Sequence, residues 1–201
     1  YDRFSEGQKK RPLGEIREEA DWLIRMVENL LSVTRIGGRG VSVVKTPTVL
    51  EELIDTVVMK FAKRYPSQEI QVEIPEEFVS IPMDAMLIGQ VLTNLLENAV
   101  RHAEGMTTLA LTVRTEGNEA VFTVADDGCG IPQDKLAGIF SGSAGGSPDS
   151  RKNNMGIGLS VCAAIIRAHG GRIWAKNRKE GGALFGFSLE AEEAFNGEQQ
   201  I

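Results

Sequence analysis

The sequence predicts an α+β sandwich in which one mixed, mostly antiparallel sheet carries helices on one face. Two observations support this prediction. Segments with helical periodicity alternate with strand-like segments from residue 41 to residue 189, and glycine-rich turns join several of the strands. The 201 residues, of which 42% are hydrophobic and 25% charged, are enough to bury one substantial core.

Four segments are expected along the chain: a flexible polar segment at 1–12, a helix at 13–37, the main domain at 38–190 and a polar tail at 191–201. The helix carries apolar residues at alternating steps of four and three, at Ile16, Ala20, Leu23, Val27 and Leu30. This heptad-like spacing favours a bundle between chains, and a helix packed on its own domain is the alternative.

The main domain is expected to contain three helices and several short strands. The first helix runs from a capping Thr48, with Glu51 completing a capping box, to about Arg64. The second starts after the capping Asp84 and ends near His102, and the third covers 156–168. Strands are expected at 41–45, 69–74, 78–81, 107–115, 119–126, 172–176 and 183–189, with a hairpin turn at Gly117-Asn118 and a flexible loop over 141–154.

Charge and cysteine content exclude several classes of function. The net charge of −6 argues against nucleic acid as a partner, because phosphate backbones are bound by basic surfaces. Two cysteines, Cys129 and Cys162, cannot form a disulfide framework and indicate a reducing compartment. The sequence contains no apolar run of about 18 residues and no signal peptide. Because it starts at Tyr1 and not at a methionine, we expect it to be part of a larger protein.

The first of three motifs with candidate chemistry lies on the second helix, where Asn94, Asn98, Arg101 and His102 share one face. Amide oxygens are hard ligands that suit Mg²⁺, and a cation beside them suits a metal-bound phosphate. An ordinary solvated polar face is the alternative.

The second motif, Asp126-Asp127-Gly128-Cys129-Gly130-Ile131-Pro132, follows a strand. Its glycines allow a tight turn that approaches a flat ligand, and the Asp126 carboxylate can accept a hydrogen bond from an exocyclic amine. A turn without further function is the alternative, and Cys129 is expected only to fill space.

The third motif, Asn153 to Leu159, joins the flexible loop to the third helix. Gly156 and Gly158 leave backbone amides exposed at a helix start, where the helix dipole favours an anion. The spacing matches neither a P-loop nor a dinucleotide-binding fingerprint.

In this order and spacing, the three motifs resemble the N, G1 and G2 boxes of the GHKL (Bergerat) ATP-binding superfamily, which includes histidine kinases and DNA gyrase. The resemblance covers about 41–189 and implies ATP and Mg²⁺ as cofactors. It implies that Asn98 ligates Mg²⁺ with Asn94 in support, and that Asp126 binds the adenine amino group. The other implied contacts are Arg101 and His102 at the phosphates, Gly128, Gly130 and Ile131 at the adenine, Gly156, Gly158 and Leu159 at the helix start, and Arg151 and Lys152 in the loop, which would be the ATP lid.

Within that superfamily, Asn94 favours a kinase over a hydrolase. The gyrase-like hydrolases carry a water-activating Glu at this position, and an amide is a poor base. An enzyme without that base is better suited to transfer the γ-phosphoryl group to another nucleophile. The segment 13–37 resembles the second helix of the dimerisation stem of sensor histidine kinases, and 28–36, 94–103 and 175–183 resemble the potassium-sensing Kdp type.

The chain departs from this family pattern in three ways. Ser143 stands where a second Phe usually follows Phe140, and Asn154 replaces the first glycine of the third motif. The phosphoacceptor histidine is absent, because only His102 and His169 occur and neither has the required context. We therefore expect a chain that binds ATP but cannot phosphorylate itself, and we expect His169 to cap the end of a helix.

The resemblance implies a cognate response regulator as partner and a homodimer formed through the stem helices of the full-length protein. It also implies the cytoplasmic domain of an inner-membrane sensor, and no contact of this part with nucleic acid or membrane. The alternatives are a GHKL serine kinase of the anti-sigma type, a nucleotide-responsive dimerisation module that promotes dephosphorylation of a regulator, and a gyrase-like ATPase, which Asn94 disfavours.

Overall fold

The computed structural model describes residues 43–141 and 155–191, with the side chains of 155–157 excepted. The expected stem helix at 13–37 lies outside the described residues. So do residues 142–154 of the expected loop and residues 192–201 of the expected tail. Arg151 and Lys152 are therefore outside them as well. Within the described part of the chain, no helix combines the length and the apolar composition needed to cross a membrane.

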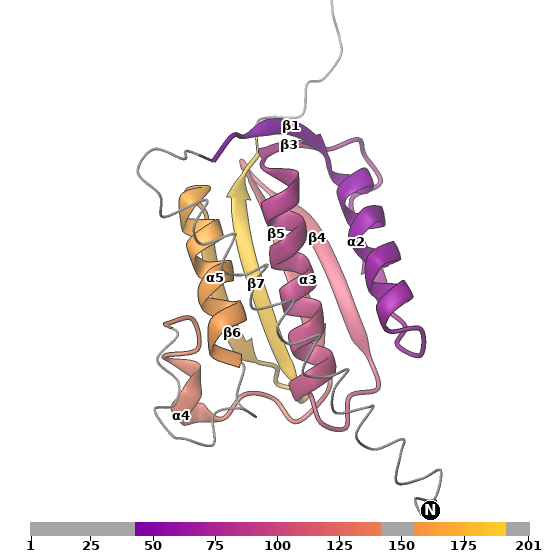
Figure 1. The fold of residues 1–201 in the computed structure, drawn as a ribbon, viewed down its shortest axis with the longest axis vertical. Coiled ribbons are helices and arrows are strands. Elements are labelled where there is room, and N and C mark those ends of the chain that lie inside the picture. Colours follow the sequence, from indigo (N-terminus) through magenta and orange to yellow (C-terminus); the bar gives the residue numbers. More distant parts are fainter. Residues whose placement is uncertain (1–42, 142–154, 192–201) are drawn as a thin grey trace, which may run out of the picture.

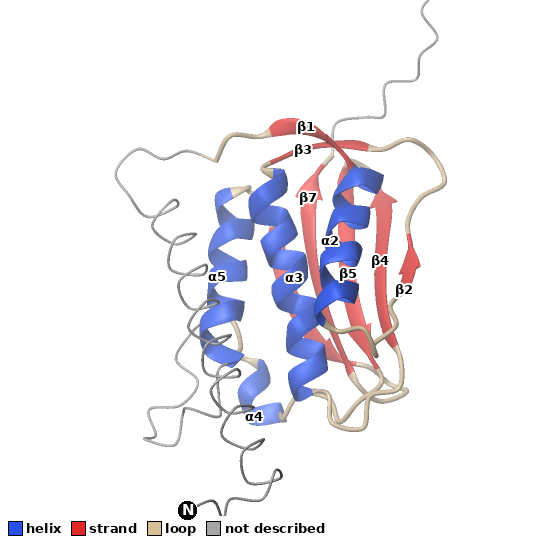
Figure 2. Ribbon diagram, turned by 45° about the vertical axis from the view of Figure 1, so that its right-hand side comes forward, coloured by secondary structure: helices blue, strands red, loops and turns tan. Residues whose placement is uncertain are grey.

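The described residues form a two-layer sandwich of a sheet and helices. The larger sheet has five strands in the order β2-β4-β5-β7-β6, and only the β2–β4 pair is parallel. Helices α2, α3 and α5 cover one face of this sheet (Figure 2). The strands are β2 (Gln71–Glu73), β4 (Leu109–Glu116), β5 (Glu119–Asp126), β6 (Arg172–Asn177) and β7 (Ala183–Glu190), and the helices are α2 (Leu50–Arg64), α3 (Ala85–His102) and α5 (Met155–Ala168). The predicted fold class is confirmed.

The core lies between the sheet and the three helices. Strand β5 alternates strictly, so that Ala120, Phe122 and Val124 point to the helices. Phe122 stacks on Phe187 of β7 with 4.6 Å between ring centroids. Helix α3 lies between α2 and α5 and buries Leu95 and Leu96 completely. Its central place in the core fixes the position of the polar residues on its remaining face.

Local signals define the ends of α3 and of the β4–β5 hairpin as expected. Asp84 caps α3, because its Oδ1 accepts hydrogen bonds from the backbone N–H groups of Met86 and Leu87, each at 3.1 Å. Gly117 takes a positive φ of 61° in the turn that joins β4 to β5. Three ends meet at one end of the molecule: the C-terminal end of α3, the end of β5 and the start of α5 (Figure 1).

The start of the domain differs from the prediction. Residues 43–45 are not in a strand; the strand β1 covers Thr46–Val49 and pairs with β3 (Ser80–Met83) in a separate two-stranded sheet. Thr48 does not cap α2, because its hydroxyl donates to the carbonyl groups of Thr46 and Met83. The N-cap is Val49, which makes no side-chain capping bond. A short helix, α4 (Gln133–Leu136), was not predicted.

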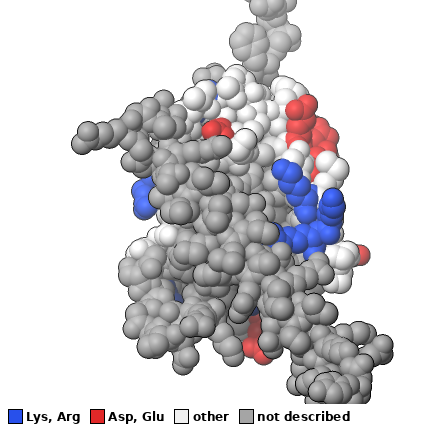
Figure 3. Space-filling model, in the orientation of Figure 1, with Lys and Arg blue, Asp and Glu red and all other residues white. Residues whose placement is uncertain are grey.

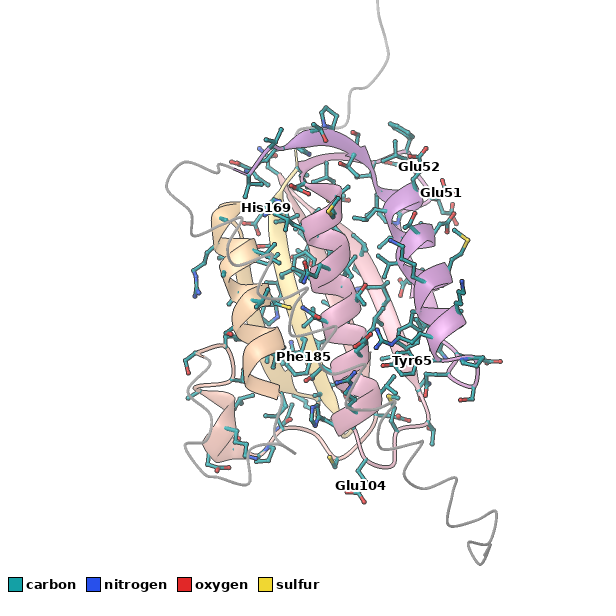
Figure 4. All side chains as sticks on the ribbon, in the orientation of Figure 1. Glu51, Glu52, Tyr65, Glu104, His169 and Phe185 are labelled. Atoms are coloured by element: carbon teal, nitrogen blue, oxygen red, sulfur yellow. The ribbon has the colours of Figure 1, made fainter. Side chains whose placement is uncertain are left out.

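His169 ends α5, as expected of a capping residue, and also ties α5 to α3. Its Nδ1 lies 2.8 Å from the Ile165 carbonyl oxygen, and its Nε2 accepts a hydrogen bond from the Asp84 backbone N–H at 3.2 Å. The side chain is buried at the end of the molecule opposite Glu104 (Figure 4). Burial lowers the pKa of His169 and Lys45 adds to this effect, while the Ile165 carbonyl group and the Asp84 charge oppose it.

A lowered pKa means that the folded state binds a proton less readily than the unfolded state. The stability contributed by neutral His169 should therefore be complete above about pH 6.5 and be lost as the pH falls from there towards the folded pKa. Replacing His169 by Ala should cost about 1–3 kcal/mol at pH 8, because it leaves the Asp84 N–H unpaired. Urea unfolding of both proteins at pH 8 and pH 5 measures this difference, which should be smaller at pH 5. An equal difference at both pH values would contradict the assignment, and Arg167→Ala, two residues away and exposed, is the control.

Candidate functional site

Helix α3 carries two amides with candidate roles. Asn94 and Asn98 are both half-buried and lie one turn apart. Burial raises the pKa of the Cys162 thiol on α5 to about 12, and a hydrogen bond with the Asn94 side chain opposes this shift. Asn94 is therefore anchored between the helices, while Asn98 lies one turn nearer the end where the three motifs meet.

The last turn of α3 carries Arg101 and His102. The Arg101 Nη2 donates to Glu97 Oε2 at 3.2 Å, so in this structure the guanidinium group is engaged with a carboxylate on its own helix. Burial, followed by the charges of Arg101 and Lys135, lowers the pKa of His102 and favours its neutral form. The His102 carbonyl group also accepts a hydrogen bond from the Cys129 thiol at 3.4 Å, which links this turn to the second motif.

Asp126 is a buried carboxylate at the end of β5. Its side chain is 3% exposed. The Oδ1 atom accepts hydrogen bonds from the backbone N–H groups of Gly128, at 3.0 Å, and Ala183, at 3.2 Å. None of its hydrogen bonds to the described residues uses Oδ2. A buried carboxylate with one oxygen that accepts no hydrogen bond can bind a ligand that provides an N–H donor.

The backbone after Asp126 packs closely against the end of α3. A Cβ atom on Gly128 would lie 2.7 Å from the Ala103 Cβ, so only glycine fits without a shift of one element. Gly130 has a φ of 75° and faces the Asn177 side chain. Ile131 follows and is buried. The structure thus brings Asp126, Gly128, Gly130 and Ile131 together with the end of α3.

Residues of the β6–β7 turn hold this loop from the other side, and the sequence analysis did not identify them as part of the site. The Asn177 amide accepts from the Ile131 N–H at 2.7 Å and donates to the Ile131 carbonyl group at 2.8 Å. Arg178 Nη1 donates to the Asp126 carbonyl group at 2.9 Å. The sequence analysis placed parts of 175–183 in two expected strands and noted its resemblance to the Kdp type, but it gave Asn177 and Arg178 no role.

Asp127, next to the buried carboxylate, was also missed. Its two oxygens accept four hydrogen bonds, from the hydroxyl and the backbone N–H of both Thr107 and Thr108. The hydroxyl groups of Thr107 and Thr108, followed by their backbone N–H groups, hold the pKa of Asp127 well below its usual range. Asp127 therefore fixes the loop to the segment that connects α3 to β4.

The third motif opens α5 at the same end of the molecule (Figure 1). Gly156 and Gly158 lie in the first turn of the helix, and a Cβ atom on Gly158 would meet no atom within 4 Å. Leu159 is 2% exposed and belongs to the core, so its side chain anchors the helix start. The N–H groups of a first helical turn have no partner within the helix and suit an anion.

Residues 83–193 match the family described as histidine kinase-, DNA gyrase B-, and HSP90-like ATPase. The sensor protein KdpD of Clostridium acetobutylicum is 34% identical over 191 residues, which are 94% of this chain and 21% of that protein. The chain therefore spans only about a fifth of the length of this relative.

Two solved structures have folds similar to that of this chain. The nucleotide-free catalytic domain of the histidine kinase ThkA superposes with a TM-score of 0.63 at 30% identity, over 73% of this chain and 95% of that domain. The histidine kinase ThkA in complex with the response regulator protein TrrA gives a TM-score of 0.72 at 25% identity, over 94% of this chain and 53% of that one.

Gly182 provides a test of how the loop is held. It has a φ of 82°, and a Cβ atom there would overlap the backbone of Asp126 and Asp127. Gly181 also has a positive φ, of 102°, but a Cβ atom there would meet nothing within 4 Å. Gly181→Ala should therefore cost only the backbone strain, about 1–3 kcal/mol, and Gly182→Ala should cost clearly more. Urea unfolding of the two variants measures this, and equal losses would show that the contact with Asp126 is not needed.

Proposed function

The chain belongs to the histidine kinase-, DNA gyrase B-, and HSP90-like ATPase family, and from this premise we propose that it is the ATP-binding catalytic part of a two-component sensor histidine kinase. In this proposal it transfers the γ-phosphoryl group of Mg-ATP to a histidine that this sequence does not contain. The residues 38–190 form the catalytic domain, and 13–37 supply the second helix of a dimerisation stem.

The buried Asp126 carboxylate is the observation that carries the proposal. Its Oδ1 is fixed by the N–H groups of Gly128 and Ala183, so Oδ2 has a defined direction. The adenine amino group can donate to this oxygen. Gly128 and Gly130 let the loop pack against Ala103 and Asn177, which holds it beside the proposed base. Ile131 would supply apolar contact, and Asp127, Asn177 and Arg178 hold the loop in the shape that fits adenine.

The phosphates would lie between the end of α3 and the start of α5. There Asn98 offers an amide oxygen to Mg²⁺, with Asn94 in support, and Gly156 and Gly158 offer backbone N–H groups to the phosphates. Among the described residues, no group of three or more His, Cys, Asp or Glu side chains could hold a metal ion. Mg²⁺ would therefore depend on the nucleotide for most of its ligands, as this ion commonly does. We assign Arg101, His102, Arg151 and Lys152 to the phosphates, and Leu159 to the support of the helix start.

One observation favours phosphoryl transfer over hydrolysis of ATP, and a second limits the choice of acceptor. Asn94 occupies the position of the water-activating base, and its amide cannot take a proton from water. The structure also makes His169 unsuitable as an acceptor, because the side chain is 2% exposed and both ring nitrogens are bonded. The acceptor would then lie on a stem helix outside this chain, and a response regulator, the kind of protein bound by ThkA, would receive the phosphoryl group next.

Phosphoryl transfer from γ-labelled ATP tests this function. The chain alone with Mg²⁺ should remain unlabelled, and a separately purified stem that carries the acceptor histidine should become labelled when the chain is added. Asp126→Asn should weaken nucleotide binding about 10- to 100-fold and reduce labelling accordingly, because an amide cannot replace the charged acceptor.

Asp134→Asn is the matched control, because it removes the same charge from the exposed surface of α4. It should leave both nucleotide binding and labelling unchanged. Label on the chain itself, or steady release of phosphate without a labelled stem, would refute the proposed transfer.

A further inference from the structure

A second buried carboxylate, Glu97, lies between α2 and α3. Its side chain is 6% exposed and pairs with two arginines from different helices. Glu97 Oε1 lies 2.9 Å from Arg64 Nη1 at the end of α2, and Glu97 Oε2 lies 3.2 Å from Arg101 Nη2, one turn further along α3. This cluster, Glu97 with Arg64 and Arg101, has a net charge of +1.

One arginine would be enough to neutralise Glu97. A buried carboxylate needs a counterion, because an unpaired charge away from water is strongly unfavourable. The second arginine is not required for that purpose. It is instead a cation held near Asn98, since Arg101 and Asn98 are three residues apart on α3 and lie on adjacent positions of the helix surface.

The two arginines differ in how firmly they are held. Arg64 is closer to Glu97 and also lies over the ring of Tyr65, with 5.9 Å from Cζ to the ring centroid. Tyr65 in turn contacts Phe61 of the core face of α2, with 4.9 Å between the ring centroids. Among the described residues, Nε and Nη1 of Arg101 make no hydrogen bond or ion pair. Arg101 is therefore the more easily released partner of Glu97.

The charges near Arg101 favour the approach of an anionic ligand. Helix α2 is acidic at its start, with Glu51 and Glu52, and basic at its end, with Lys63 and Arg64. Figure 3 shows Lys and Arg side chains gathered on the side of the molecule where α2 ends. A polyphosphate that approaches the end of α3 would meet this positive surface, which favours its binding.

We propose that Arg64 and Glu97 are positioning residues that control Arg101 during nucleotide binding. When a polyphosphate binds beside Asn98, the Arg101 guanidinium group turns from Glu97 to a phosphate oxygen, and Arg64 remains as the counterion of Glu97. Arg64 thus removes the cost of leaving Glu97 unpaired, although it does not touch the nucleotide. This inference rests on the proposed function, because it concerns the phosphates of the same site.

Replacement of Arg64 by Met tests this role. Arg101 then becomes the sole counterion of Glu97 and must stay there, so affinity for a non-hydrolysable ATP analogue should fall about tenfold. Adding Glu97→Gln to Arg64→Met should restore most of that affinity, because a neutral amide no longer holds Arg101. Lys63→Met removes a neighbouring charge from the same exposed end of α2 but no ion pair with Glu97. As the control, it should lower the affinity much less than Arg64→Met does.

Calorimetry gives the affinity for the ATP analogue, and an NMR titration gives the millimolar affinity for adenosine. Adenosine has no phosphate, so Arg64→Met should bind it as the unaltered chain does, whereas a collapsed pocket would bind it more weakly. Unchanged affinity of Arg64→Met for the ATP analogue, failure of Glu97→Gln to restore it, or an equal loss for adenosine would each overturn the inference. If the unaltered chain binds no nucleotide, the proposed function fails together with this inference.

A measurement on the unaltered chain covers the case in which Arg64→Met does not fold. The side-chain Nε–Hε resonances of Arg64 and Arg101 are followed by NMR during titration with the ATP analogue. The Arg101 resonance should move strongly and the Arg64 resonance should stay in place. An Arg101 resonance that is unchanged by saturating nucleotide would also overturn the inference.

Discussion

The site depends on one constraint: the Asp126 carboxylate is buried, and a buried carboxylate must be bonded. Its Oδ1 accepts from Gly128 within the loop and from Ala183 at the start of β7, so it joins two segments that are far apart in the sequence. Close approach of these segments excludes a side chain at Gly182, and Arg178 completes the contact through the Asp126 carbonyl group. The same contacts leave Oδ2 of Asp126 without a hydrogen bond to the described residues, which connects the packing of the sheet to the proposed recognition of adenine.

The two buried carboxylates among the described residues are satisfied in different ways, and the difference suits different parts of a nucleotide. Asp126 is held by backbone N–H groups, which cannot move without unfolding the strand, and this rigidity suits a flat base. Glu97 is held by two arginine side chains, one of which can leave while the other stays. A movable cation suits a phosphate chain whose charge changes during transfer. In the proposed function, the chain combines a fixed base pocket with an adjustable phosphate end.

Much of the fold follows from local signals in the sequence. Asp84 was identified as a cap because the capping bonds lie within three residues, and the β4–β5 hairpin was identified from Gly117-Asn118. Helix α2 buries the apolar residues that recur at helical spacing in its sequence, Leu50, Leu53, Ile54, Val57 and Phe61. The prediction for Thr48 was wrong because pairing of β1 with β3, across more than thirty residues, takes its hydroxyl away from the helix start.

In the site too, residues that are adjacent in the sequence could be predicted, and contacts between distant residues could not. Asp126 and the two glycines of the second motif were identified because they are adjacent in the sequence. Asn177, Arg178 and Gly182 were not, because their contacts with the loop cross about fifty residues and have no local pattern. The pairing of Arg64 with Glu97 likewise joins two helices that the sequence could not place side by side. Sequence periodicity specifies elements, and distant polar contacts specify the geometry of the site.

The central claim is that Asp126 recognises the amino group of adenine, and a change in the ligand tests it most directly. Purine riboside triphosphate has the shape and charge of ATP but carries no amino group at carbon 6. Calorimetry with Mg²⁺ compares the two nucleotides on the unaltered chain. The account predicts that ATP binds at least about 100-fold more tightly, because without the amine the buried carboxylate keeps an unpaired oxygen. Equal affinities would contradict it, and the buried carboxylate would then have to be explained by the packing of the loop alone.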